Sequence, residues 1–252
     1  MSPRHWPRPA LATTALATTA LATTALALLA AAAVAGCGAS ASTSRARATE
    51  TAGVAAATGA KGYTATQLKD ALLTKAGGQR PAAAAQAGDY GTLPDVRTSK
   101  QSMKGVKVTP ADCAEATVAG FNSAAFSHAP AAVVTFRVGR DGVSEVLVSA
   151  SSQLAKTALD YRLPARCSHY KATTDGKTFS YTVHQSTVGG LADQARALNV
   201  KASGYAQVDV WSLVYRGSGF VGAVTMVGSG ASQRGVETLA SQAYSHAEQA
   251  LS

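Results

Sequence analysis

The stretch that decides the fold is Val208-Asp209-Val210-Trp211-Ser212-Leu213-Val214-Tyr215-Arg216, followed by Gly217-Ser218-Gly219 and the apolar run Phe220 to Val227. Both runs are rich in β-branched and aromatic residues, and the first alternates with a period of two, which is typical of a β-strand. A short glycine-rich segment between two such runs is typical of a hairpin turn. The sequence therefore predicts two antiparallel strands, Tyr205 to Arg216 and Phe220 to Val227.

The period of two divides the first strand into two faces. One face, with Ala206, Val208, Val210, Ser212 and Val214, is expected to be covered by helices. The other carries Tyr205, Gln207, Asp209, Trp211, Leu213 and Tyr215. One interpretation of this second face is a solvated surface with aromatic cross-strand pairs. The other is the wall of a ligand groove, because Trp and Tyr combine apolar area with a hydrogen-bonding end. The groove candidates are Tyr205, Gln207, Asp209, Trp211 and Tyr215.

Two further hairpins are expected upstream, because apolar β-branched runs flank Asp-Gly pairs. They are Ala131 to Val138 with Val143 to Ser149 around Asp141-Gly142, and Ser168 to Thr173 with Thr178 to Gln185 around Asp175-Gly176. The segment from Ser186 to Ser203 is ambiguous, and Leu191 to Leu198 fits a short helix. The polar stretch from Arg80 to Val106 has little periodicity and is expected to be a long loop.

Four helices are predicted from capping residues and from apolar stripes with helical spacing. They are Thr66 to Leu73, a helix from the N-cap Thr109 to about Ala119, a helix capped by Ser151 or Ser152 that Pro164 ends, and Arg234 to Leu251. The expected buried stripes are Leu154, Ala155, Ala158 and Leu159 in the third, and Val236, Leu239, Ala240, Ala243, Ala247 and Leu251 in the fourth. Together these elements predict a single α+β domain, an antiparallel sheet with helices packed on one face.

The N-terminal part has the features of a bacterial export signal. Residues 9 to 36 carry no charge, and Val34-Ala35-Gly36-Cys37 matches a bacterial lipobox, in which the Cys receives lipid after cleavage. We predict a lipoprotein signal peptide over residues 1–36, lipidation at Cys37, a flexible tether over residues 37–62 and a folded domain over residues 63–252. An uncleaved membrane anchor is the alternative. Both interpretations place the domain on the extracellular side of the cell membrane.

Cys113 and Cys167 are the two remaining cysteines. In an oxidising compartment two such thiols most simply form one disulfide. The alternative is a metal site formed by Cys113, Cys167 and His169, but zinc requires four ligands and this spacing matches its known motifs poorly. We therefore favour the disulfide and expect no metal.

The charge balance and the motifs limit the function. The chain has 23 Lys and Arg and 14 Asp and Glu, a net charge of +9, so a tethered domain will lie close to anionic lipid. No basic stripe with interleaved aromatic residues is present, which argues against a nucleic-acid partner. Gly217 to Gly222 matches G-x-G-x-x-G, but a strand follows it where a dinucleotide site needs a helix. Gly228-Ser229-Gly230 lacks the lysine of a phosphate-binding loop.

No catalytic residue is predicted. The sequence contains neither G-x-S-x-G nor H-E-x-x-H, and His128, His169, His184 and His246 are far apart along the chain. We therefore expect a protein that is not an enzyme and that needs no cofactor.

The order of elements resembles a known group. A Leu-Leu helix, a polar stretch ending in Pro110-Ala111-Asp112-Cys113, strands, a helix, Cys167 and the Val208 to Arg216 strand pair recur in PknH-type extracellular sensor domains and related actinobacterial lipoproteins. The resemblance covers about Tyr63 to Leu251. It implies an antiparallel sheet backed by helices, a cleft, disulfide bonding and a ligand-sensing role. Those relatives generally have more cysteines, so a second bridge is missing here.

Three functions are compatible with these observations. The first is a lipid-anchored ligand-binding or sensor-like lipoprotein without catalytic activity, whose partner is a small molecule or a component of the cell envelope. The second is a hydrolase or transferase of the envelope. The third is a structural protein that contacts a membrane partner or the cell wall.

Overall fold

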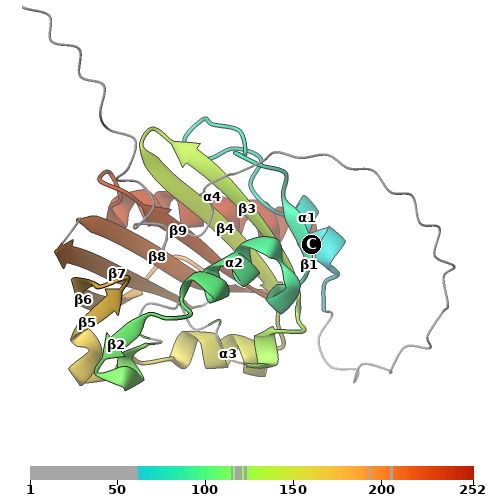
Figure 1. Cartoon of the computed structure of the whole chain (residues 1–252). Helices are drawn as coiled ribbons and strands as arrows, with labels where there is room; N and C mark the ends of the chain where they lie inside the picture. The colour runs from blue at the N-terminus through green and yellow to red at the C-terminus, as the bar shows by residue number, and fades with distance from the viewer. Residues whose placement is uncertain (1–61, 115, 117–120, 122–123, 193, 205–206) are drawn as a thin grey trace, which may run out of the picture.

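Nine antiparallel strands form a single sheet in the computed structural model, which describes residues 62–114, 116, 121, 124–192, 194–204 and 207–252 (Figure 1). The strand order is β1-β3-β4-β9-β8-β7-β6-β5-β2, and every neighbouring pair is antiparallel. The expected signal peptide, the lipidation site Cys37 and the tether lie outside the described residues.

The element bounds are as follows. The strands are β1 Gln86–Asp89, β2 Lys107–Thr109, β3 Pro130–Val138, β4 Asp141–Ser149, β5 His169–Thr174, β6 Lys177–Val188, β7 Ala195–Gly204, β8 Val208–Gly217 and β9 Phe220–Val227. The α-helices are α1 Ala65–Asp70, α2 Pro94–Ser102, α3 Ser152–Asp160 and α4 Gln233–Leu251. Short 3-10 turns cover Tyr90–Thr92, Ala111–Cys113, Ala124–Phe126 and Ala165–Ser168. None of the helices described is long and apolar enough to cross a bilayer.

All three predicted hairpins are present. In the β5–β6 turn, Asp175 and Gly176 both have positive φ angles, 48° and 72°, as a two-residue hairpin turn requires. The β3–β4 turn is two residues earlier than predicted. Asp141 already pairs with Val138, so Gly139 and Arg140 make the turn, with Gly139 at φ 63°.

One face of the sheet is covered by α1 and α4. The apolar side of α4 (Val236, Leu239, Ala240, Ala243 and Ala247) is buried as predicted. It packs with Leu68 of α1 against a cluster that includes Leu213 and Tyr215 of β8 and Phe220 of β9. Tyr215 lies at the centre of this core, because its ring makes edge contacts with both Phe220 and Tyr244.

The opposite face is covered by α3, with Leu93 and Phe126 from neighbouring loops. Ser151 caps α3 by accepting a hydrogen bond from the backbone N–H of Leu154, and the helix buries Ala155, Ala158 and Leu159. These side chains meet Val214 and Val221, which alternate with the residues under α4. The single α+β domain with an antiparallel sheet is thus confirmed, but its helices pack on both faces and not on one.

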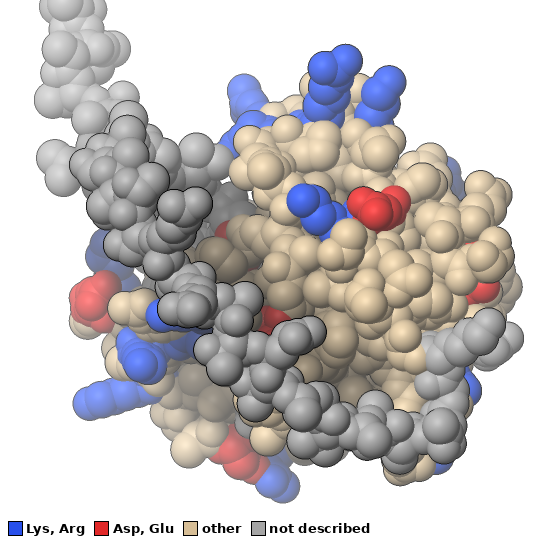
Figure 2. Space-filling model, turned by 90° about the vertical axis from the view of Figure 1, so that its right-hand side faces the viewer, with Lys and Arg blue, Asp and Glu red and all other residues tan. Residues whose placement is uncertain are grey.

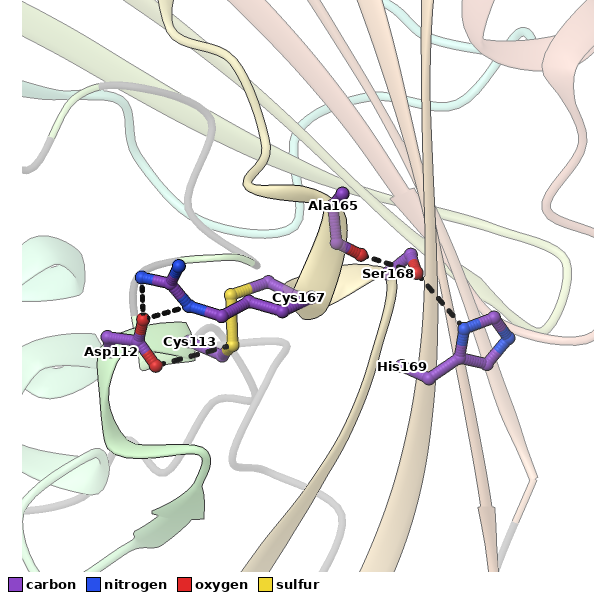
Figure 3. The surroundings of a disulfide bond; sticks show 7 residues. Asp112, Cys113, Ala165, Cys167, Ser168 and His169 are labelled. Carbon is purple, nitrogen blue, oxygen red and sulfur yellow. Dashed lines mark hydrogen bonds and ion pairs between the residues drawn. A yellow bond between two sulfur atoms is a disulfide. The ribbon is translucent and has the colours of Figure 1, made fainter.

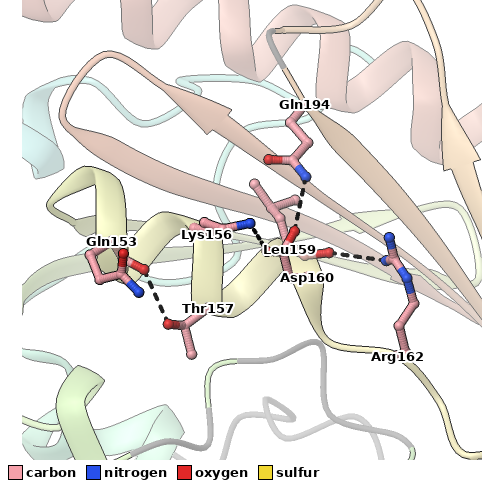
Figure 4. A network of polar contacts seen from close by, with 7 residues as sticks. All are labelled: Gln153, Lys156, Thr157, Leu159, Asp160, Arg162 and Gln194. Atoms are coloured by element: carbon pink, nitrogen blue, oxygen red, sulfur yellow. Dashed lines mark hydrogen bonds and ion pairs between the residues drawn. The ribbon is translucent and has the colours of Figure 1, made fainter.

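Polar contacts hold the C-terminal end of α3 against the sheet (Figure 4). Asp160 accepts hydrogen bonds from Lys156 and, at 3.4 Å, from Gln194; the contact with Lys156 lowers the pKa of this carboxyl. The buried Arg196 of β7 donates to the carbonyl oxygens of Ala158 and Tyr161. Its positive charge therefore lies at the negative end of the helix dipole.

Three local predictions were wrong. The stretch expected to be a loop, Arg80 to Val106, contains β1 and α2. Thr109 is not a helix N-cap, because it is the last residue of β2 and pairs with Lys171. Only a 3-10 turn follows it, and most of residues 114–120 lie outside the described residues. The segment from Leu191 to Leu198, expected to form a short helix, instead leads into β7, which pairs on both sides.

Candidate functional site

One face of part of the sheet is not covered by any helix among the described residues. α4 contacts β8 and β9 and stops short of the far strands, which lie at the opposite end of the strand order from α1 (Figure 1). We call this surface the open face and define it by the strand register. Its side chains are Lys107, Thr109, His169, Lys171, Thr173, Thr178, Ser180, Thr182, His184, Ser186, Asn199, Lys201, Ser203, Asp209 and Trp211.

Cross-strand pairing aligns these side chains in rows. One row is His169, Thr182, Lys201 and Asp209, from β5, β6, β7 and β8 in turn. The next row is His184, Asn199 and Trp211. Neighbouring strands lie about 4.8 Å apart and alternate residues about 6.7 Å apart, so the open face measures roughly 20 Å in each direction. A surface of this size can contact an extended ligand.

Asp209 is held in place at the edge of the open face. Its carboxylate accepts a hydrogen bond from Asn199 Nδ2 at 2.6 Å and lies 3.8 Å from Lys201 Nζ. The same amide nitrogen donates to the carbonyl oxygen of Val210 at 3.2 Å. Asn199 is buried, with 3% of its surface exposed, so its two hydrogen bonds satisfy an amide that would otherwise be costly to bury.

Trp211 lies at the boundary between the open face and the α4 core. It is half-buried and packs against the core cluster under α4, while Asn199 and Met226 are its cross-strand partners. The indole therefore has one side in ordinary core packing and leaves part of its area in solvent. That arrangement gives a fixed aromatic surface beside polar groups.

The structure does not bring the five groove candidates together. Asp209 and Trp211 lie on the open face, and Gln207 precedes β8 and is exposed. Tyr205 lies outside the described residues. Tyr215 was assigned to the groove wrongly, because α4 covers it and none of its surface is exposed. The alternation along β8 correctly identified residues that share one face of the strand. However, α4 covers only the second half of this face, where Tyr215 lies.

The partners of Asp209 and Trp211 were not predicted from the sequence. His184, Asn199 and Lys201 come from β6 and β7, and β7 was not recognised as a strand. Apolar and polar residues alternate along β7, which is the pattern of a strand. Its buried Leu198, Val200 and Ala202 separate the polar residues.

The far side of the same strands is a core built around the disulfide. Cys113 and Cys167 are bonded and fully buried, with a Cα–Cα distance of 5.3 Å. They pack with Tyr170 and Tyr181, whose rings stack with centroids 4.8 Å apart. The predicted disulfide is therefore confirmed. The alternative metal site is wrong, because both sulfurs are used in the bridge and neither is a free thiolate.

Ser168 and His169, beside the disulfide, form the nearest arrangement to a nucleophile and base (Figure 3). Ser168 Oγ lies 3.1 Å from His169 Nδ1 and 2.9 Å from the carbonyl oxygen of Ala165. The carbonyl can only accept, so the serine hydroxyl donates to it and accepts from the histidine. An activated serine needs the reverse, a hydroxyl that donates to the imidazole. Asp112 does not orient this histidine; it is paired with Arg166.

One carboxyl group is deeply buried away from the open face. Glu145 of β4 is 1% exposed, and its Oε2 accepts a hydrogen bond of 2.8 Å from the backbone N–H of Leu73. Burial raises the pKa of Glu145 to about 8, although this hydrogen bond acts in the opposite direction. Tyr215 is also buried, and its burial raises its pKa well above the ordinary value. The nearby Glu145 acts in the same direction. These groups lie under α1 and α4, where a soluble ligand has no access.

The glycine motifs serve the fold. Gly217 ends β8 and Phe220 begins β9, so the G-x-G-x-x-G segment forms a hairpin, as the sequence analysis concluded. Gly222 leaves room for the ring of Tyr215, because a Cβ there would lie 2.2 Å from that ring. At the other motif, the backbone N–H of Gly230 donates to Asp141 at 3.0 Å. A carboxylate of the chain itself therefore occupies that position.

The side of the molecule that carries α1 and β1 differs from the open face. Figure 2 shows that Lys and Arg side chains on this side lie mainly toward its margins, while uncharged residues occupy much of its middle. The exposed segment from Pro81 to Ala84 precedes β1. This side does not present the rows of polar and basic residues that characterise the open face.

Comparison with known proteins gives a structural likeness alone. No protein-family model matches the chain, and no curated protein sequence matches it. Its structure is similar to the extracellular domain of PknH from Mycobacterium tuberculosis, with a TM-score of 0.51 and 12% sequence identity. The match covers 76% of this chain and 100% of that domain. A protein from Mycobacterium smegmatis described as an Rv0999 ortholog also matches, with a TM-score of 0.41 and 17% identity over 66% of this chain and 86% of that one. The chain has the α+β fold of the PknH extracellular domain.

Proposed function

We propose that this chain is an extracytoplasmic lipoprotein, anchored through Cys37, that binds a ligand of the cell envelope on its open face and catalyses no reaction. The observation that carries the proposal is the half of one sheet face over which the described part of the chain places no helix. The residues there are those that recognise polar ligands, with Trp211 fixed at one edge and Asp209, Asn199 and Lys201 connected beside it.

Three findings support a binding role. The described histidines and carboxylates form no serine–histidine–acid arrangement, and Ser168 has the wrong hydrogen-bond direction for a nucleophile. The fold is that of the PknH extracellular domain, and an extracellular location agrees with the lipobox at Cys37. Finally, the buried Asn199 holds Asp209 in place by a hydrogen bond, so binding at Asp209 would cost little side-chain ordering.

The test is to extract the full chain from its native membrane under mild conditions and to identify bound molecules by mass spectrometry after denaturation. We expect a molecule that is present at a fixed ratio with the natural protein and is lost from Trp211→Ala and from Lys171→Glu. Lys171 is exposed, so its substitution is expected to leave the fold intact even if the loss of Trp211 disturbs the core.

Lys100→Glu on α2, which is also exposed and lies outside the open face, is the matched control and should retain the molecule. The proposal fails if the natural protein carries nothing, or if all three variants retain the molecule to the same extent.

A further inference from the structure

The open face has a strongly unequal charge. It carries three lysines, Lys107, Lys171 and Lys201, together with His169 and His184, and all five side chains are exposed. Among the described strand residues that project from it, Asp209 is the one carboxylate. Its charge is already offset by Lys201 and by the amide of Asn199. Lys107 and Lys171 have no acidic neighbour in their rows, so the surface complements an anion.

Hydroxyl groups fill the space between these charges. Thr173 and Thr178 are cross-strand partners whose hydroxyls lie 2.9 Å apart. Ser180 follows on β6, between Lys171 and Ser203 in the next row. A hydroxyl both donates and accepts, so this lattice can pair with a ligand that is itself rich in hydroxyls. A simple inorganic anion would leave most of these groups unused.

The aromatic group completes the pattern. Trp211 presents part of its indole to solvent at the end of the row formed by His184 and Asn199. Sugar rings have an apolar C–H face and polar edges. An aromatic side chain flanked by amide and imidazole groups therefore suits a sugar ring better than it suits a fully charged surface.

From these features we infer that the open face binds an anionic polysaccharide, with Trp211 beneath one sugar ring and Lys107 and Lys171 against its acidic groups. The inference rests on the proposed function and gives the class of its ligand. The rows extend roughly 20 Å without a wall on the described strands, which fits an extended polymer. A lipid headgroup is the competing anion, because a tethered domain lies close to anionic lipid. A single headgroup would leave most of these hydroxyls unused, whereas a polysaccharide offers a partner to each.

The experiment uses intrinsic fluorescence. The chain has two tryptophans, Trp6 and Trp211. Trp6 lies in the predicted signal peptide, so the cleaved lipoprotein contains Trp211 alone, and Trp6→Phe ensures that any uncleaved chain also reports on Trp211 alone. The probes are polygalacturonate, in which each sugar carries a carboxylate, and a neutral galactose polymer of matched length. We expect polygalacturonate to change the emission of Trp211 and to bind at least about tenfold more tightly than the neutral polymer, with an affinity that falls as salt rises.

Two matched pairs of variants test which lysines bind the polymer. Removing the two lysines of the open face that have no acidic neighbour, Lys107→Ala with Lys171→Ala, should weaken polygalacturonate binding on the order of tenfold. Removing two exposed lysines elsewhere, Lys100→Ala with Lys104→Ala, keeps the same net charge and should leave binding within about twofold. Equal effects of the two pairs would overturn the inference, and so would binding to anionic lipid vesicles without binding to polygalacturonate.

The outcome is separable from that of the proposed function. If the native extract yields an uncharged molecule that depends on Trp211, the binding role stands and the inference about its chemical class fails. If the native extract yields nothing, the binding role itself fails.

Discussion

Replacing both Cys113 and Cys167 by alanine is expected to lower the free energy of unfolding by roughly 2–5 kcal/mol. The two cysteines are separated by 54 residues, and closing a loop of that length restricts the unfolded chain by about 4 kcal/mol in the entropy model. Denaturant unfolding of the full chain measures the change. The bridge joins the 3-10 turns before β5 and after β2, so the stacked Tyr170 and Tyr181 should lose their fixed packing first.

The reduced natural protein is the control for this prediction. A thiol reductant should destabilise the natural protein to the level of the double variant and should leave the double variant unchanged. A double variant that loses less than about 1 kcal/mol would show that the bridge contributes little to stability.

Glu145→Gln is expected to stabilise the protein at neutral pH by roughly 3 kcal/mol, because one pKa unit corresponds to about 1.4 kcal/mol. The pKa of Glu145 is about 8 in the folded protein, well above the ordinary value of 4.5. Between these two values the folded state holds a proton that the unfolded state has released. The stability that this proton contributes is therefore complete below pH 4.5 and is lost as the pH rises toward 8.

The variant removes this dependence. Unfolding free energies measured from pH 4 to pH 8.5 should fall steeply in the natural protein, and the Glu145→Gln protein should lack that part of the fall. Gln keeps the acceptor for the backbone N–H of Leu73. Glu237→Gln, on α4, is the control and should retain the slope of the natural protein. Parallel curves for the natural protein and Glu145→Gln would contradict a buried carboxyl that is protonated at neutral pH.

The strands that were predicted correctly carry their signal locally. In β3, β4, β8 and β9, β-branched residues and glycine turns specify the pairing with the next segment of the chain. α3 and α4 were predicted for the same reason, because Ser151 caps one helix and an uninterrupted apolar stripe defines the other. The disulfide followed from the count of cysteines and the expected compartment.

The elements that were missed depend on distant partners. β1 has four residues, none of them β-branched, and is a strand because its backbone pairs with β3. α2 buries none of its own residues, so it has no apolar stripe to detect. The segment predicted as a helix, Leu191 to Leu198, instead leads into β7. Pairing with β6 on one side and β8 on the other satisfies the backbone of this strand.

Only part of the candidate site could be predicted from the sequence, for a related reason. Alternation correctly placed Asp209 and Trp211 on one face of β8. It also placed Tyr215 there, and only the position of α4 shows that this tyrosine belongs to the core. Lys201 and Asn199 could be recognised as neighbours only once the register of β7 was known.

Acrylamide quenching of Trp211 fluorescence tests the central claim, that the open face is the ligand surface. The measurement compares the full Trp6→Phe chain as extracted from its native membrane with the same chain after it has been unfolded, stripped of bound molecules and refolded. The account predicts weaker quenching in the native extract, because the ligand covers the solvent-exposed part of the indole. It also predicts that adding back the stripped molecules restores the protection. Equal quenching in the two samples, although the native extract demonstrably carries a bound molecule, would contradict the account by placing the ligand elsewhere on the protein.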